Sequence, residues 1–366
     1  MTRVLIAVLC VLAGLVAVAW LIATLAFEGP DHTRFDTPRP DASAQGRGGE
    51  SAEHAAAAQA IRRGPPEPST GDRAAQLQAM RQALDSRGAA MPIGATVTPV
   101  DVDGISSEWL VPINVVPGRR LLYLHGGGYV MGSARSHRPI SSRFAVATRA
   151  AVLAIDYRLL PEASRQDGID DARKAYRWLL GNGPGGRAEA AAILVAGDSS
   201  GGNLALSTIA WARDAGLTAA SAVIVLSPHT DATFASPSLL RNIATDAMQG
   251  SALGPLVRAP RPIALWMAFL MNRMSPGNAA VSPLFGDLSG LPPMLIQVSA
   301  TEMFLDDAVR YANKARASGS QVDLQVWPHT LHVWHAFATP ETDEAFVGIA
   351  AFVATRLERP LPAMEP

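Results

Sequence analysis

A serine flanked by small residues stands at Gly197-Asp198-Ser199-Ser200-Gly201. This Gly-x-Ser-x-Gly pattern lies between a strand-like apolar run, 193–196, and a helical pattern, 204–215. A sharp strand-to-helix turn of this kind lifts the central hydroxyl above a sheet, and small residues are needed because the backbone turns so tightly. The pattern therefore predicts that Ser199 is a nucleophile. The competing interpretation is a phosphate-binding loop at a helix N-terminus, but no lysine lies nearby.

A second glycine-rich segment, His125-Gly126-Gly127-Gly128, follows the apolar run 120–124. Glycines let the backbone approach a substrate and aim its N–H groups at a developing negative charge. We expect the amides of Gly126, Gly127 and Gly128, together with the amide of Ser200, to form an oxyanion hole. His125 precedes the glycines, so we expect it to shape the loop rather than to act as a base.

A serine nucleophile needs a base and a carboxylate that orients this base. With this type of elbow the chain order is serine, acid, histidine. The acid should follow the apolar run 294–298, where Glu302 lies in the next turn. Asp306 and Asp307 directly precede a helical pattern and look like residues that cap it. We expect Glu302 to be the acid, with Asp306 as the alternative.

The base should follow the last apolar run, 322–327, where His329, His332 and His335 compete. We expect His332 to be the base, because it stands in the middle of the loop and can reach back to Ser199. A spacing of three residues could also indicate a metal-binding face. No acidic or cysteine partner accompanies these histidines, so the sequence predicts neither a metal nor another cofactor.

These candidates are placed by a chain that alternates strand and helix from about residue 96 onward. The strand-like runs are 120–124, 151–155, 193–196, 222–226, 294–298 and 322–327. Continuous apolar strands separated by helices predict an α/β fold with a mostly parallel sheet and helices on both faces. The alternation lapses between 231 and 282, which is too long for a plain loop and indicates a helical insertion that covers the site.

The first residues have a different character. The uncharged run from Val4 to Phe27 exceeds the roughly 20 apolar residues that cross a bilayer, and it predicts a membrane anchor or signal segment over residues 1–28. A cleaved signal peptide and a buried helix are the alternatives. Arg3 favours an N-terminus inside the cell and hence an extracytoplasmic domain, whereas Arg34 and Arg39 oppose this orientation.

Residues 29–72 are rich in proline, glycine and alanine, and they predict a flexible tether. Residues 73–87 have apolar positions at helical spacing and begin the folded part. We therefore expect a fragment that begins near Gly71 to fold and to retain activity.

Composition excludes several classes of protein. The chain has 366 residues, a net charge of −1 and 17% charged residues, so neither a nucleic-acid-binding surface nor a disordered chain is indicated. Apolar residues make up 48%, which suffices for a large core. Cys10 is the only cysteine, which rules out an intrachain disulfide framework.

The motifs together resemble the hormone-sensitive-lipase-like family of bacterial α/β-hydrolase esterases. They are His125-Gly126-Gly127-Gly128, Asp156-Tyr157-Arg158-Leu159 with Pro161-Glu162, Gly197-Asp198-Ser199-Ser200-Gly201-Gly202-Asn203, Ser227-Pro228 with Asp231, Ser282-Pro283-Leu284, and His332-Val333-Trp334. The resemblance implies the α/β-hydrolase fold over a catalytic domain at 73–360. It also implies a helical cap built from 73–95 and 232–281.

The chain departs from this family at several positions. Members usually carry aspartate where Glu302 stands and alanine where Ser200 stands. A glutamate can orient the base equally, and the backbone N–H at Ser200 is unaffected by its side chain. After Pro161-Glu162 the usual His and Pro residues are replaced by Ala163-Ser164-Arg165-Gln166.

The resemblance implies a serine carboxylesterase that acts on a small-molecule ester with a short to medium acyl chain. A deacetylase of a small acetylated metabolite is one alternative. A non-catalytic ligand-binding protein is the other, and the presence of His332 argues against it. The sequence does not decide whether the chain forms a homodimer.

Overall fold

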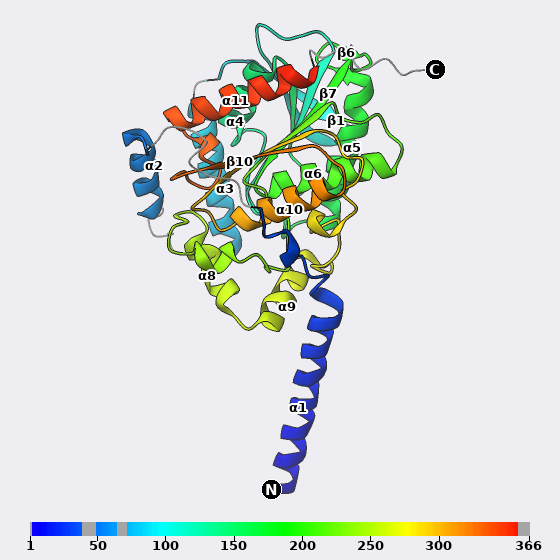
Figure 1. Cartoon of the computed structure of the whole chain (residues 1–366), viewed down its shortest axis with the longest axis vertical. Helices are drawn as coiled ribbons and strands as arrows, with labels where there is room; N and C mark the ends of the chain where they lie inside the picture. The colour runs from blue at the N-terminus through cyan, green and yellow to red at the C-terminus, as the bar shows by residue number, and fades with distance from the viewer. Residues whose placement is uncertain (1, 39–48, 64–71, 92, 358–366) are drawn as a thin grey trace.

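The computed structural model describes residues 2–38, 49–63, 72–91 and 93–357. Its centre is an eight-stranded sheet in the order β1-β2-β4-β3-β7-β8-β9-β10 (Figure 1). The strands are β1 (Thr96–Val102), β2 (Ile105–Val111), β3 (Arg119–Leu124), β4 (Ala151–Ile155), β7 (Ala192–Asp198), β8 (Ala222–Leu226), β9 (Met294–Ser299) and β10 (Val322–Trp327). A short hairpin of β5 (Asn182–Gly183) and β6 (Gly186–Arg187) lies apart from it.

The predicted mostly parallel sheet is confirmed. All six runs that the sequence singled out are strands, and β3, β4, β7, β8, β9 and β10 pair in parallel. At one edge of the sheet, β1 pairs with β2 and β2 pairs with β4, and both pairings are antiparallel. The apolar runs in the sequence did not predict this edge.

Helices cover both faces of the sheet because alternate strand residues point to opposite sides. Leu122 and Leu153 pack in the core on one face, beneath α5 (Arg165–Gly181), α6 (Ser200–Asp214) and α10 (Leu305–Ala317). Their neighbours Leu121 and Val152 pack on the other face, against α4 (Arg138–Thr148) and α11 (Pro340–Leu357). A one-residue change of register would exchange these two cores.

The predicted insertion between β8 and β9 is helical. It consists of α7 (Ser238–Arg241), α8 (Gly250–Arg258) and α9 (Arg261–Asn272). The other segment expected in the cap, α3 (Arg73–Ala90), lies along α4. From α3, the Arg81 guanidinium donates to the carbonyl oxygens of Val130 and Leu160 and pairs with Glu162 at 2.9 Å.

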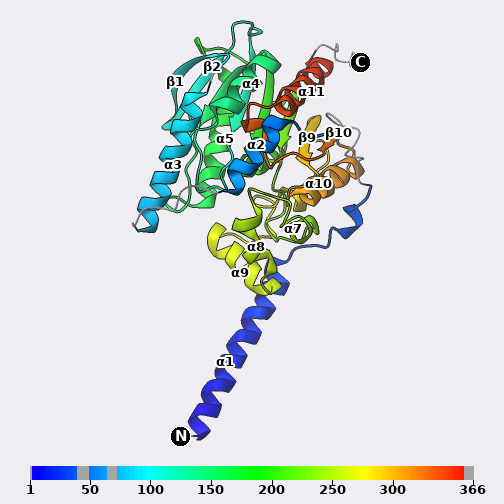
Figure 2. The same ribbon diagram turned by 90° about the vertical axis from the view of Figure 1, so that its left-hand side faces the viewer.

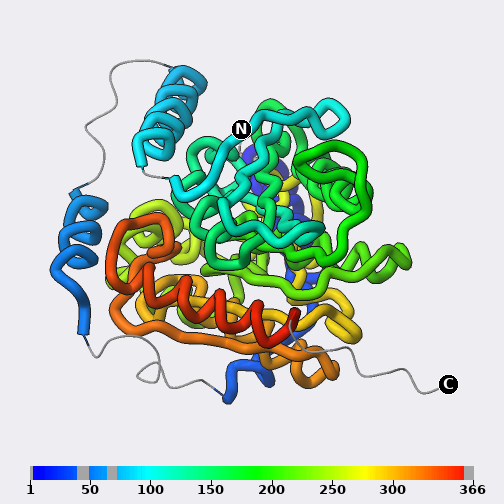
Figure 3. Tube along the Cα trace, turned by 90° about the horizontal axis from the view of Figure 1, so that it is seen from above, coloured from blue at the N-terminus to red at the C-terminus, as the bar shows by residue number. Residues whose placement is uncertain are grey.

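The segment expected to be a flexible tether is not free of the domain where the structure describes it. The guanidinium of Arg310 pairs with Asp36 at 2.6 Å. Further along, α2 (Ala52–Arg62) lies beside the start of α11 (Figure 3), and Ser51 is held there by Glu341 through its backbone N–H and its hydroxyl. The composition of the segment did not predict these contacts, because they join it to residues far along the chain. Residues 39–48 and 64–71 lie outside the described part.

The first helix, α1 (Thr2–Ile22), projects from the domain beside α9 (Figure 2). It continues as a short π-helical turn, Ala23–Phe27. The span Arg3–Phe27 contains an 18-residue stretch with a mean hydropathy of 3.0 and is long and apolar enough to cross a membrane. A signal sequence meets the same criteria.

Candidate active site

The nucleophile elbow has the geometry that its sequence predicts. Ser199 lies between β7 and α6 with a φ of 51° and a ψ of −118°, a conformation that non-glycine residues rarely adopt. The turn is possible only with glycine beside it, because a Cβ on Gly201 would collide with the carbonyl oxygens of Leu124 and His125. The strained backbone aims the Ser199 hydroxyl away from the helix and toward the loop after β10.

The structure brings His332 to Ser199. The Nε2 atom of His332 lies 3.0 Å from the Ser199 hydroxyl oxygen, within hydrogen-bond distance. Both side chains are buried, and Val333 next to the histidine has a left-handed φ of 52° that shapes the loop. The arrangement of a hydroxyl and an imidazole in contact is the one that nucleophilic catalysis requires.

Glu302 lies on the other side of this imidazole. Its Oε1 atom is 3.5 Å from His332 Nδ1, which is somewhat long for a hydrogen bond, and neither atom has another hydrogen-bond partner among the described residues. Its Oε2 atom accepts hydrogen bonds from the Ser227 hydroxyl at 2.8 Å and from the Ser299 amide at 3.3 Å. These contacts hold the carboxylate with one oxygen aimed at the histidine.

Burial and charge shift the protonation of this pair. Burial by itself lowers the pKa of His332, but the adjacent Glu302 carboxylate outweighs it, so the pKa lies above the ordinary 6.5. Burial raises the pKa of Glu302, and the nearby imidazole partly offsets this shift. The imidazolium is thus favoured once it forms, which is what the proton transfer from Ser199 needs.

The other two histidines of this loop do not reach Ser199. His335 is completely buried, and its Nε2 lies 2.9 Å from the side-chain oxygen of Gln297. Burial lowers the pKa of His335 to about 3, so this imidazole is neutral. His329 is exposed. The three histidines therefore do not converge, and the described residues contain no group of three or more metal-ligating side chains.

Asp306 and Asp307 serve the cap rather than His332. The Asp306 carboxylate accepts from the Ser238 amide at 2.9 Å and pairs with Arg241 at 3.2 Å. Asp307 accepts from the amides of Thr230 and Asp231. The expectation that both residues cap α10 is wrong. The N-cap of α10 is Phe304, and no side chain caps this helix. The two carboxylates instead accept hydrogen bonds from other segments.

The amides of the loop expected to form the oxyanion hole have different partners. Gly127 has a φ of 117°, and a Cβ there would collide with the Met131 carbonyl, so only glycine fits. The Gly128 amide donates to the Ser200 hydroxyl oxygen at 3.0 Å, a contact that a substrate oxygen could replace. The Gly126 amide instead donates to the Asp198 carboxylate at 3.0 Å. Its expected place in the oxyanion hole is therefore contradicted, because this N–H is already used inside the protein.

His125 has the structural position that was expected. It is almost completely buried, its Nδ1 lies 2.8 Å from the Gly126 carbonyl oxygen, and its ring stacks on Tyr157 with centroids 4.2 Å apart. Burial lowers the pKa of His125 to about 3. A neutral, stacked imidazole of this kind supports the loop and does not take up protons at neutral pH.

Sequence reasoning missed the group that holds the oxyanion loop in place. Asp198 is buried and accepts from the Tyr123 hydroxyl and the Gly126 amide, and its Oδ2 lies 3.6 Å from Nε2 of His137. Burial raises the pKa of this carboxyl, but His137 and its other partners outweigh burial and lower it. The position of Asp198 inside the elbow motif was the available signal, whereas nothing in the sequence linked His137 to it.

The second missed residue is His54, in the segment expected to be a tether. Its imidazole is completely buried, and its Nε2 accepts a hydrogen bond from the Leu331 amide at 3.0 Å. Leu331 directly precedes His332, so α2 supports the loop that carries the candidate base. Burial lowers the pKa of His54, which keeps Nε2 free to accept.

This contact reverses the expectation for truncated chains. A chain that begins at Asp72 lacks α2, and we expect its specific activity to fall more than about tenfold relative to a chain that begins at Gly29, because small displacements of a catalytic group are costly. The measurement is ester turnover per mole of folded protein. Full activity of the shorter chain would show that α2 does not position the loop.

A point substitution separates support of the loop from loss of a whole helix. We expect His54→Ala to lower kcat in the full chain, with Glu53→Ala as its matched control, since Glu53 is exposed on the same helix. Equal activity of the two variants would contradict the role assigned to His54.

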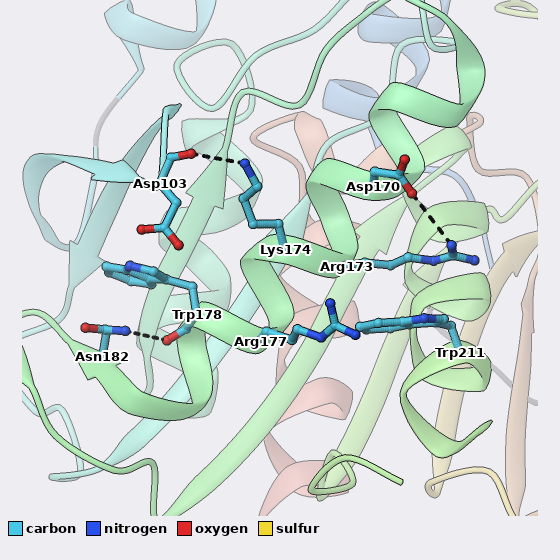
Figure 4. Close-up of a pocket in the computed structure, with 8 residues that line it drawn as sticks. All are labelled: Asp103, Asp170, Arg173, Lys174, Arg177, Trp178, Asn182 and Trp211. Atoms are coloured by element: carbon cyan, nitrogen blue, oxygen red, sulfur yellow. Dashed lines mark hydrogen bonds and ion pairs between the residues drawn. The ribbon is translucent and has the colours of Figure 1, made fainter. Parts of the chain in front are cut away.

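An open pocket of about 550 Å³ lies elsewhere, between α5, α6 and the β1–β2 turn (Figure 4). Arg173 and Arg177 lie over the ring of Trp211, and Arg173 also pairs with Asp170 at 3.7 Å. The two guanidinium groups of the pocket therefore already contact other residues that line it. None of its lining residues belongs to the constellation around Ser199.

Comparisons with known proteins agree with this geometry. A family model described as alpha/beta hydrolase fold matches residues 121–336. An acetyl-hydrolase of Streptomyces hygroscopicus is 38% identical over 276 residues, which are 72% of this chain and 84% of that protein. An esterase of Acinetobacter venetianus is 31% identical over 76% of this chain and 89% of its own.

Solved structures give the same result. An esterase/lipase from an uncultured bacterium superposes with a TM-score of 0.72 at 33% identity, over 85% of this chain and all of the other. An esterase from the bacterial hormone-sensitive lipase family gives a TM-score of 0.71 at 31% identity, over 84% of this chain and 99% of the other.

Proposed function

The chain belongs to the α/β-hydrolase fold family, among the carboxylic ester hydrolases of the bacterial hormone-sensitive lipase type, and on this premise we propose that Ser199, His332 and Glu302 are its catalytic triad. The observation that carries the proposal is the chain of contacts from the Ser199 hydroxyl to His332 Nε2 and from His332 Nδ1 to Glu302. Each of the three follows the carboxyl end of a different strand, where α/β sheets place their chemistry.

The reaction follows from this arrangement. The Ser199 oxygen attacks the ester carbonyl carbon while its proton moves to His332 Nε2. The amides of Gly127, Gly128 and Ser200 stabilise the oxyanion, and the Glu302 carboxylate stabilises the imidazolium. His332 then protonates the leaving alcohol, which yields an acyl-enzyme. Water, deprotonated by His332, releases the acid and restores Ser199. No step calls for a metal or an organic cofactor.

The acid limb of the pH profile tests the electrostatics of the pair. His332 must be neutral to accept the proton, and its raised pKa keeps it protonated to a higher pH than an ordinary histidine. We therefore expect kcat/KM to rise with pH through a midpoint above 6.5. A midpoint at or below that value would show that the Glu302 carboxylate does not act on His332.

The apolar residues beside the triad support a short to medium acyl chain. Phe304 contacts the His332 ring edge-on, with centroids 5.4 Å apart, and packs in a cluster with Leu239 and Met303. Leu253 and Val257 of the cap complete this cluster on its outer side. An apolar group of this kind beside the candidate base suits a short apolar acyl chain. The acetyl-hydrolase among the relatives points in the same direction.

A series of p-nitrophenyl esters tests the function and the acyl length together. We expect kcat/KM to be highest for the acetate or the butyrate and to fall for the octanoate and the palmitate. An N-acetyl amide of a small metabolite serves as the comparison for the deacetylase alternative. Turnover of that amide without turnover of any ester would overturn the carboxylesterase assignment.

We propose that α1 remains attached as a membrane anchor. The segment is uncharged from Val4 to Phe27, and the turn that follows α1 packs on the cap, with the Phe27 ring buried beside Phe269. A signal peptide that is cleaved off does not contribute to the mature fold, so contacts of this segment with α9 favour its retention. The N-terminal sequence of the mature protein in membranes is the test, and a start within or after the run from Val4 to Phe27 would overturn it.

A further inference from the structure

The outer face of α9 carries apolar side chains that point into solvent. They recur at positions i, i+4, i+7 and i+8 and so form one stripe along the helix. Between 46% and 66% of each is exposed, and they are Ile263, Met267, Leu270 and Met271. The inner side of α9 is also apolar, with Leu265 completely buried. A helix that is apolar on all sides requires a partner on its outer side as well.

The position of α1 indicates what that partner is. The same end of the domain carries both α9 and the root of α1 (Figures 1 and 2). Trp266 of α9 donates from its indole nitrogen to the Ala19 carbonyl at 2.9 Å, and its ring contacts Phe27 edge-on. Arg261 pairs with Glu28 at 3.5 Å. These contacts fix the stripe, here called the α9 stripe, relative to the axis of α1.

The length of α1 sets the level of the bilayer surface. Its 21 residues from Thr2 to Ile22 span about 30 Å at the α-helical rise, which equals the thickness of the hydrocarbon region. The membrane surface then falls at the following turn, Ala23–Phe27, which is the part that packs on α9. Trp20 and Trp266 lie at this level, where tryptophan is enriched in membrane proteins.

The charge of the insertion fits an anionic lipid surface. Arg258 and Arg273 flank α9 and are exposed. The only acidic residue between Thr233 and Phe285 is Asp246, which is buried. An apolar face bordered by arginines is the pattern of a helix that lies in the interface of a membrane.

We propose that the α9 stripe is seated in the surface of the bilayer that α1 spans, so that the cap faces the membrane and the enzyme takes its ester substrate from the lipid phase. This rests on the proposed function and on retention of α1. An apolar cluster connects the cap to the candidate triad. Leu253 and Val257 of α8 pack against Phe304, and Phe304 contacts His332. The substrate class is an ester that dissolves in a bilayer and carries a small acyl group.

The first experiment measures whether lipid covers the stripe. The full chain with Cys10→Ser receives a single cysteine, either Leu270→Cys or, as the matched control, Val347→Cys, because Val347 is equally exposed but lies on α11 at the opposite end. Each variant is labelled with an environment-sensitive dye and reconstituted into phosphatidylcholine–phosphatidylglycerol vesicles that contain headgroup-level spin-labelled lipid.

We expect the dye at position 270 to be quenched at least about threefold more than the dye at position 347, because a membrane-seated side chain lies at the depth of the quencher. Equal quenching at the two positions would overturn the proposal. A dye at position 270 that is shielded equally in detergent, together with cross-linking of two chains through Leu270→Cys, would show that a second copy covers the face, and it would also overturn the proposal.

The second experiment measures the source of the substrate. We expect Leu270→Asp to lower turnover of dioleoylglycerol acetate in vesicles about tenfold, because a charge at the interface unseats the helix. Turnover of p-nitrophenyl acetate in water should remain unchanged, since Leu270 contacts none of the reacting groups. Unchanged turnover of the lipid ester would overturn the proposal.

Lower turnover of both the lipid ester and p-nitrophenyl acetate would mean that Leu270→Asp has disturbed the cap. In that case the quenching experiment on the dye-labelled chains decides whether the α9 stripe lies in the membrane. If the full chain hydrolyses neither ester, the proposed function fails. The quenching experiment still tests the membrane seat in that case, so the two failures are distinguishable.

Discussion

Ser199→Ala is expected to lower kcat by a factor on the order of 10⁶, because it removes the atom that attacks the ester and leaves only the contribution of binding and the oxyanion hole. A fluorophosphonate should label the parent enzyme at Ser199 alone, since this is the hydroxyl that contacts His332 Nε2 within the described part of the chain. The measurements are single-turnover kinetics and mass spectrometry of the labelled peptide.

Ser200→Ala is the matched control for this substitution. The Ser200 side chain accepts from the Gly128 amide, and its removal leaves the backbone N–H of residue 200 in place. We expect kcat to stay within about threefold of the parent, because the oxyanion is held by backbone groups. Labelling at Ser200, or loss of activity in this variant alone, would show that the elbow is assigned one residue out of register.

Glu302→Gln is expected to lower kcat by a factor on the order of 10³–10⁴, with little change in KM. The amide cannot stabilise the imidazolium, which forms only along the reaction path, so the loss falls on the transition state and not on substrate binding. Glu302→Asp should be intermediate, because the shorter side chain reaches His332 Nδ1 less well from the same backbone.

Asp306→Asn is the control for the acid. Asp306 is as deeply buried as Glu302, but it binds Ser238 and Arg241 in the cap. Its substitution should cost roughly 1 kcal/mol of stability, or a few degrees in Tm, with kcat little changed, because a charged contact between cap and domain is weakened. Loss of activity at unchanged Tm in Asp306→Asn would make Asp306 the acid and contradict the assignment of Glu302.

Much of the fold could be predicted because its signals are local. Continuous apolar runs identified six parallel strands, since a strand covered on both faces has no polar side. The antiparallel pair β1 and β2 escaped detection because one of its members is largely exposed and lacks such a run. The insertion was predicted as helical from its length and spacing, although the irregular spacing did not define where its helices begin and end.

The candidate site could be predicted to the extent that motif and chain order specify it. The short-range pattern around Ser199 implies a turn that only small residues permit, and chain order restricts the acid and the base to two loops. Within those loops, placement alone favoured Glu302 and His332. Only the contacts with Ser227, Ser299 and Ser199 separate them from Asp306, His329 and His335.

Residue types and spacing therefore suffice for the strand pattern, the elbow, the order of the triad candidates and the apolar character of the first helix. Three contacts became known only from the folded chain: the Gly126 amide binds Asp198, His54 supports the loop of His332, and α1 ends against α9. Apolar periodicity and backbone strain are properties of neighbouring residues. A hydrogen bond between residues such as 54 and 331 depends instead on how the whole chain packs, and no local pattern records it.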